Sequence, residues 1–128
     1  MGMDFNSNKP IYLQIYDNIC ESILSGAMVP GERIQSVREY ATEVGVNPNT
    51  VMRTYDKLTR DGIIYNKRGI GFFVCDDGRS RVLESTRETF LEQELPAIVR
   101  RLRLMEMDPK VLMEHLESKD VEIRSNNQ

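Results

Sequence analysis

Two helix starts, at Ser36 and Asn47, constrain the fold of this 128-residue chain more than any other feature of its sequence. Ser36 and Glu39 have the spacing of a capping box, in which each side chain accepts a hydrogen bond from the other residue's backbone N–H. Asn47 is followed by Pro48, and an Asn cap with Pro at the first helical position is a typical helix start. Gly45 lies between the two starts and can adopt the left-handed conformation that ends a helix. The sequence therefore predicts two short helices joined by a tight turn.

The segments around this turn extend the prediction to a complete domain. Ala41 is small where two helices would cross, and Val51 can fill the space beneath the second helix, which is predicted to run to about residue 61. Residues 63–75 consist of two β-rich runs on either side of the turn sequence KRGIG, which is the pattern of a hairpin. Two short helices followed by a glycine-tipped hairpin predict a winged helix-turn-helix.

A further helix is predicted in front of this motif, over residues 10–26. Isoleucines recur there every four residues from Ile11 to Ile23, which is the spacing of an amphipathic helix. A Pro-Gly turn at residues 28–34 then leads into a very short extended piece. The predicted fold class is therefore mostly α with a small β-hairpin wing, an N-terminal winged helix-turn-helix followed by a C-terminal helical dimerisation segment.

The charge distribution points to nucleic acid, although the whole chain is acidic. The 17 Lys+Arg and 20 Asp+Glu residues give a formal net charge of −3. Residues 33–74, however, contain seven basic and four acidic residues, so this part carries +3 and the remainder carries −6. Positive charge gathered on a winged helix favours binding to the phosphate backbone of double-stranded DNA. The alternative for the basic residues of the second helix is a solvated helix face.

The second helix of the motif and the hairpin turn supply candidate DNA contacts. A recognition helix in the major groove presents its N-terminal residues to base edges, where Asn pairs with adenine and Arg with guanine. Basic side chains on the hairpin turn, and the backbone at its glycines, suit contacts to phosphate or to the minor groove. The predicted DNA-binding residues are Arg38, Asn47, Asn49, Thr50, Arg53, Lys57, Lys67, Arg68, Gly69 and Gly71.

The rest of the chain is predicted to be helical. The polar run Asp76-Asp77-Gly78 marks the boundary, so the predicted domains are a winged helix-turn-helix at residues 8–76 and a helical dimerisation segment at residues 79–120. Residues 81–105 have a helical pattern, and from Leu91 to Met105 the apolar residues have heptad spacing. Pro96 lies inside this seam, which predicts a kink or two abutting helices. A last short helix follows.

The apolar face of this segment has two alternative uses. It could pack within one chain, but two short helices bury little apolar surface, and pairing with a second copy removes that shortage. We therefore predict a homodimer, in which two recognition helices lie about one turn of DNA apart. The residues predicted at the dimer interface are Leu91, Leu95, Ile98, Leu102, Met105, Leu112 and Leu116.

Other function classes lack the residues they need. Cys20 and Cys75 are far apart without a CxxC pair, and His115 is the one histidine, so we expect no metal, no cofactor and no enzyme. Without a signal-peptide pattern or an apolar stretch long enough to span a bilayer, the protein is expected in the cytoplasm, with no membrane contact. The alternative to DNA binding is a winged-helix protein-interaction module. No small-molecule effector is indicated.

Three segments carry a family resemblance, namely PIYLQIYDNICESILSG, PGERIQSVREYATEVGVNPNTVMRTYDKLTRDGII and GIGFFV. They cover roughly residues 10–75 and resemble the GntR family of transcriptional regulators. The resemblance implies that DNA is contacted by Arg38, in the sequence QSVR, and by the start of the recognition helix at residues 47–50. It also implies that Gly69 or Gly71 is the wing glycine.

Two further features refine this resemblance. Pro48 and Met52 stand where many members of the family carry Arg, and Arg53 is available to take over a base contact. The sequence NPNT, together with a tail of about 50 residues after the hairpin, resembles the YtrA-like subfamily. That resemblance implies a short helical segment that makes a dimer, usually a repressor, with frequent linkage to transporter operons.

Overall fold

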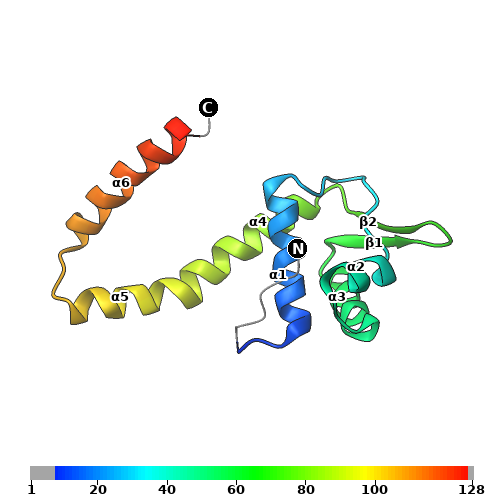
Figure 1. Cartoon of the computed structure of the whole chain (residues 1–128). Helices are drawn as coiled ribbons and strands as arrows, with labels where there is room; N and C mark the ends of the chain where they lie inside the picture. The colour runs from blue at the N-terminus through cyan, green and yellow to red at the C-terminus, as the bar shows by residue number, and fades with distance from the viewer. Residues whose placement is uncertain (1–7, 127–128) are drawn as a thin grey trace. The chain divides into compact units, whose positions relative to one another are not determined.

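The computed structural model describes residues 8–126, and the side chains of residues 8–119 (Figure 1). The chain divides into two compact units, the first ending at Thr86 and the second beginning at Arg87. As predicted, the fold is mostly helical with one small antiparallel hairpin. The elements are α1 (Ile11–Ser25), α2 (Val37–Val44), α3 (Pro48–Arg60), β1 (Ile64–Lys67), β2 (Gly71–Val74), α4 (Gly78–Thr89), the π-helical turn η1 (Phe90–Glu94), α5 (Leu95–Leu104) and α6 (Pro109–Asn126).

The core of the first unit lies where α1 packs against α3. Ile15 and Ile19 of α1 are fully buried, as are Val51 and Leu58 of α3. Burying one such side chain contributes about 1.5–3 kcal/mol, so this contact holds α3 firmly in place. Ile11, which continues the isoleucine pattern in the sequence, is instead 42% exposed at the first position of α1.

Both predicted helix starts are confirmed. The Glu39 N–H donates to the Ser36 hydroxyl at 3.1 Å, and the Ser36 N–H donates to the Glu39 carboxylate at 3.0 Å. Gly45 ends α2 with a φ of 73°, and the Asn47 side chain accepts from the N–H of Asn49 at 2.8 Å. Local capping therefore sets the turn between α2 and α3.

The predicted hairpin is confirmed, and it gains a neighbour on its second strand. β1 and β2 pair antiparallel, with Ile64 opposite Val74. The extended piece before α2 lies along β2, because the Gly31 N–H donates to the carbonyl of Val74 and the Ile34 N–H donates to that of Phe72, both at 2.9 Å. The segment leading into α2 is thus bonded to the wing.

The first unit extends beyond the polar run at residues 76–78. Gly78 is the first residue of α4, and Val82 in the same helix is 2% exposed within the core. A Cβ on Gly78 would lie 2.8 Å from the carbonyl oxygen of Ile63, so glycine allows the start of α4 to approach the segment before β1. The predicted boundary between a DNA-binding domain and a dimerisation segment at residues 76–78 stays a prediction.

Pro96 alters the second unit's helix without breaking it. Proline has no N–H to donate to the carbonyl four residues earlier. The preceding residues form the π-helical turn η1, in which the Leu95 N–H donates to the carbonyl of Phe90. The predicted irregularity therefore takes the form of a π turn between two α-helices. The last helix, α6, has 18 residues and is longer than predicted. No helix in the part of the chain that the structure describes is long and apolar enough to cross a membrane.

Candidate nucleic-acid interface

The N-terminal half of α3 presents polar side chains on the side opposite the core. Val51 and Thr54 are fully buried, whereas Asn49 and Arg53 are exposed and Thr50 is half-buried. These three polar residues lie within five positions at one end of the helix, as the sequence predicted. Amide, hydroxyl and guanidinium groups there can form hydrogen bonds to base edges or phosphates.

Asn47 is exposed beside them, but its side chain already has a structural task. Its Oδ1 accepts the hydrogen bond from Asn49 N–H that starts α3. A bidentate contact to adenine uses both the oxygen and the nitrogen of the amide. The Asn47 amide nitrogen remains as a donor, so this residue suits an acceptor such as a phosphate oxygen better than a paired contact to adenine.

Arg53 is held by an aromatic ring on α1. Its guanidinium carbon lies 3.9 Å from the centre of the Tyr12 ring, within the range of a cation–π contact. The buried hydroxyl of Thr54 donates to the backbone carbonyl of Tyr12 at 2.7 Å and fixes that part of α1 against α3. The ring contacts one side of the guanidinium, and the N–H groups that face away from the ring are available to a base.

Lys57 is drawn into contacts with α1 and with the end of its own helix. Its ammonium lies 4.3 Å from the centre of the Tyr16 ring and donates to Asp61 at 2.8 Å. The Tyr16 hydroxyl donates to the same carboxylate at 2.6 Å. Burial opposes ionisation of Asp61, but the hydrogen bonds from Lys57 and Tyr16 outweigh it and lower the pKa of the carboxyl. The structure therefore places Lys57 in a polar cluster between α1 and α3.

This cluster adjoins Cys20, which is half-buried against the core. Burial, reinforced by the charge of Asp17, raises the pKa of the Cys20 thiol to about 12. The thiol is therefore protonated near neutral pH and has little nucleophilic character. Cys75 is also a free thiol, and burial raises its pKa too.

Arg38, Lys67 and Arg68 are exposed basic residues on α2 and on the wing. Arg38 lies in the first turn of α2, and within the described residues it makes no hydrogen bond or ion pair. Lys67 ends β1 and Arg68 lies in the turn, with the Lys67 ammonium 5.9 Å from the centre of the Phe73 ring. All three can reach phosphate groups of a ligand outside the protein.

The two wing glycines differ in their surroundings. Gly69 has a φ of 80°, and a Cβ there would meet open space, so it is the turn itself that needs glycine. Gly71 has a φ of 141°, and a Cβ there would lie 2.8 Å from Nε of Arg33. Gly71 therefore makes room for an arginine of the same chain.

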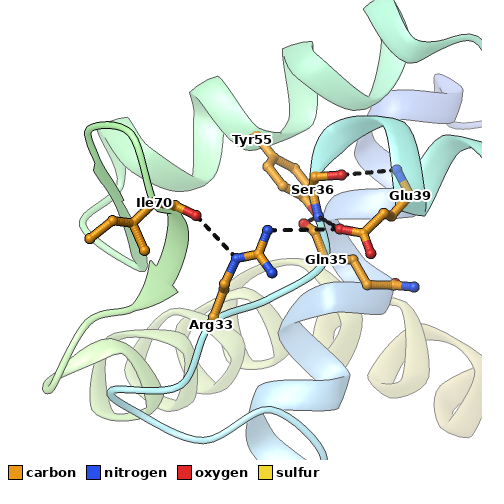
Figure 2. A network of polar contacts seen from close by, with 6 residues as sticks. All are labelled: Arg33, Gln35, Ser36, Glu39, Tyr55 and Ile70. Carbon is orange, nitrogen blue, oxygen red and sulfur yellow. Dashed lines mark hydrogen bonds and ion pairs between the residues drawn. The ribbon is translucent and has the colours of Figure 1, made fainter.

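Arg33 is a residue of this region that the sequence did not single out. Figure 2 shows its guanidinium between the wing turn and α2. Arg33 Nε donates to the carbonyl of Ile70 at 3.2 Å, and its Nη2 lies 3.9 Å from a Glu39 carboxylate oxygen. In the same view the Tyr55 hydroxyl donates to the carbonyl of Gln35 at 2.7 Å and ties α3 to the approach of α2. No local pattern in the sequence singles out Arg33, because the backbone carbonyl that its side chain binds, that of Ile70, lies 37 positions further along the chain.

The predicted dimerisation residues lie in the second unit and are largely open to solvent. Leu91, Met105 and Leu116 are more than half exposed, and Ile98 is 37% exposed. Leu95, Leu102 and Leu112 are partly buried. An open groove of about 520 Å³ lies along η1 and α5, lined by Leu91, Leu95, Pro96, Val99, Arg100 and Arg103.

Sequence comparisons connect the first unit and the whole chain to known proteins. Residues 11–74 match the family described as bacterial regulatory proteins, gntR family. The chain is 31% identical over 118 residues to the HTH-type transcriptional regulator YhcF of Bacillus subtilis, covering 92% of this chain and 96% of the relative. It is 37% identical over 97 residues to the HTH-type transcriptional repressor YtrA of the same species, covering 76% of this chain and 74% of the relative.

Solved structures extend the similarity to the fold. A transcriptional regulator of the GntR family from Bacteroides thetaiotaomicron has a TM-score of 0.69 and 39% sequence identity, over 93% of this chain and 100% of that one. The DNA-binding domain of AraR, in complex with the operator ORX1, has a TM-score of 0.52 and 26% identity, over 59% of this chain and 93% of that one. One similar domain has thus been observed on DNA.

Proposed function

Because the chain belongs to the GntR family of bacterial regulatory proteins, we propose that it represses transcription by binding an inverted-repeat operator as a homodimer. The family and the relatives are transcriptional regulators and not enzymes. YtrA, which matches three quarters of this chain, is named a repressor, and this supports repression over activation.

One observation carries the DNA-binding part of the proposal. The N-terminal half of α3, where Asn49 and Arg53 are exposed and Thr50 is half-buried, belongs to a winged unit that is similar in fold to the operator-bound domain of AraR. In this arrangement α3 enters the major groove and its N-terminal residues meet base edges. Arg53 is suited to guanine and Asn49 to adenine.

Positive charges around α3 supply affinity that does not depend on sequence. Arg38 on α2 and the wing residues Lys67 and Arg68 are exposed, and phosphate contacts from such residues release counterions from DNA. The wing then lies along the minor groove or the backbone, with the glycine turn allowing close approach. Lys57, held by Asp61 and Tyr16, has a structural role in this scheme.

Dimerisation is assigned to the second unit. Its exposed apolar residues, Leu91, Ile98, Met105 and Leu116 among them, would be costly to leave in water in a free monomer. A two-fold pair would present two copies of α3 to successive major grooves and so match an inverted repeat. The predicted interface also includes Leu95, Leu102 and Leu112, which are partly buried.

The test is an electrophoretic mobility shift with DNA from upstream of the protein's own gene, at two salt concentrations. A complex that prefers one sequence and weakens at higher salt supports operator binding. DNA binding that is weak, indifferent to sequence and insensitive to salt would contradict the proposal and favour a winged-helix protein-interaction module.

A further inference from the structure

Arg33 lies at the point where the wing, the extended piece before α2 and α2 itself come together (Figure 2). Its backbone forms an isolated β-bridge with Phe73 of β2. Its side chain crosses to the wing turn, where Nε donates to the carbonyl of Ile70 at 3.2 Å. The other end of the guanidinium faces Glu39, which caps α2.

The wing turn is shaped to receive this side chain. Gly71 has a φ of 141°, which L-residues with a side chain rarely adopt, and a Cβ there would lie 2.8 Å from Arg33 Nε. The hydrogen bond of Arg33 goes to a backbone carbonyl and does not depend on which side chain the turn carries at position 70. The charged residues of the wing, Lys67 and Arg68, lie three and two positions before this carbonyl in the sequence.

We propose that Arg33 is a positioning residue that fixes the wing turn against the extended piece leading into α2, so that Lys67 and Arg68 meet the DNA backbone in register with α3. This inference rests on the proposed DNA-binding function. The hydrogen bond to Ile70 and the close packing at Gly71 carry most of the effect. The pair with Glu39 contributes little, because both side chains are more than half exposed and the atoms are 3.9 Å apart.

The rival explanation is that Arg33 itself binds a phosphate. Its side chain is 52% exposed, so a direct contact is sterically open to it. The two roles make different demands on the side chain. A direct phosphate contact needs positive charge, which Lys also supplies, whereas the present hydrogen bond needs the Nε donor of the guanidinium.

The first experiment is carried out on the free protein and does not involve DNA. Hydrogen exchange is followed at the Ile70 amide, which donates to the carbonyl of Lys67 at 2.9 Å inside the turn. Arg33→Met is expected to speed exchange at this amide while leaving the amides of α1 unchanged. Arg87→Met, which removes the same charge from an exposed site in the second unit, is the matched control. Unchanged exchange at Ile70 in Arg33→Met would overturn the positioning role.

The second experiment is a double-mutant cycle on a DNA duplex selected from a randomised pool by the wild-type protein. Arg33→Met is expected to weaken binding by about threefold to tenfold, the cost of ordering a wing that the free protein no longer holds. The combined change Lys67→Ala and Arg68→Ala is expected to weaken binding in the wild-type background but to have little further effect in Arg33→Met. Arg33→Lys is expected to behave like Arg33→Met.

The outcomes separate this inference from the proposed function. Additive effects in the cycle, with Arg33→Lys binding like the wild type, would show a direct phosphate contact and refute positioning. If the wild-type protein selects no duplex, the proposed DNA binding is refuted. The proposed effect of Arg33 on DNA affinity is then refuted as well, whereas its effect on the wing turn is still tested by hydrogen exchange. Normal circular dichroism and an unchanged melting temperature in Arg33→Met exclude general unfolding as the cause of any loss.

Discussion

Removing the Tyr12 ring that contacts Arg53 tests whether α1 holds the Arg53 side chain of α3 in place for the proposed contact with DNA. In Tyr12→Leu the guanidinium of Arg53 loses the ring whose centre lies 3.9 Å away. The hydrogen bond from Thr54 goes to the backbone carbonyl of Tyr12, so we expect the variant to keep it. The change therefore frees the Arg53 side chain without removing the contact that joins α1 to α3.

The size of the effect follows from the exposure of the pair. Arg53 is exposed and Tyr12 is half-buried, so the cation–π contact belongs to the lower range, about 0.5–1 kcal/mol. An Arg53 side chain freed from the ring must be immobilised when DNA binds, which costs about 0.5–1.5 kcal/mol. We expect Tyr12→Leu to weaken binding to a selected duplex by about twofold to tenfold. Arg53→Ala, which removes the proposed base contact itself, is expected to cost about 1–3 kcal/mol.

Fluorescence anisotropy with the selected duplex measures the affinities of the wild type, Tyr12→Leu and Arg53→Ala, which are expected to decrease in that order. The matched control is Tyr12→Phe, which keeps the ring and is expected to bind like the wild type. Arg53→Ala is also expected to relax the preference at one base pair, whereas Tyr12→Leu is expected to keep it. Wild-type affinity in Tyr12→Leu, or equal losses in the Leu and Phe variants, would refute the reasoning.

Two further predictions concern the dimer and the dependence of stability on pH. Leu95→Glu and Ile98→Glu are expected to give monomers in sedimentation experiments, since each places a charge on the predicted interface, and persistent dimers would move the interface elsewhere. Glu39 and Asp61 both have a lowered pKa in the folded protein. Hydrogen bonds from Ser36 lower the pKa of Glu39. Burial alone would raise the pKa of Asp61, but the hydrogen bonds from Lys57 and Tyr16 outweigh it. A carboxyl of this kind stabilises the fold fully above its unfolded-state pKa and loses that contribution as pH falls through its folded-state pKa. We therefore expect the free energy of unfolding, measured with urea, to fall as the solution is acidified below the ordinary carboxyl pKa. Asp61→Asn is expected to make this fall less steep. The same dependence on pH in Asp61→Asn and in the wild type would contradict this expectation.

Features set by neighbouring residues could be predicted from the sequence. The capping box at Ser36, the Asn47 cap and the Gly45 stop each depend on residues within a few positions, and all three are confirmed. The buried face of α3 follows from helical periodicity, because Val51 and Leu58 repeat at the spacing of one helix face. The winged fold emerges from the order of these local signals.

Features set by contacts across the sequence could not be predicted in the same way. Lys57 lies one helical turn after Arg53, and the sequence suggests that both face DNA. Only the packing of α1 reveals that Tyr16 and Asp61 hold the Lys57 ammonium. Arg33 was missed for the same reason, since its partner Ile70 is 37 positions away.

The net charge of +3 on residues 33–74 does not by itself say which basic residues can meet DNA, because several of them have partners within the protein. Arg33 and Lys57 each have partners that place the wing or the end of α3, and Arg53 is stacked on Tyr12. A positive charge already paired with a carboxylate, as in Lys57, releases fewer DNA counterions than an unpaired one. The basic residues of the winged unit thus divide into one group that builds the interface and another, led by Arg38 and Arg68, that can neutralise phosphate. The excess of positive charge marks where DNA would bind, while the partners of each side chain determine what it contributes there.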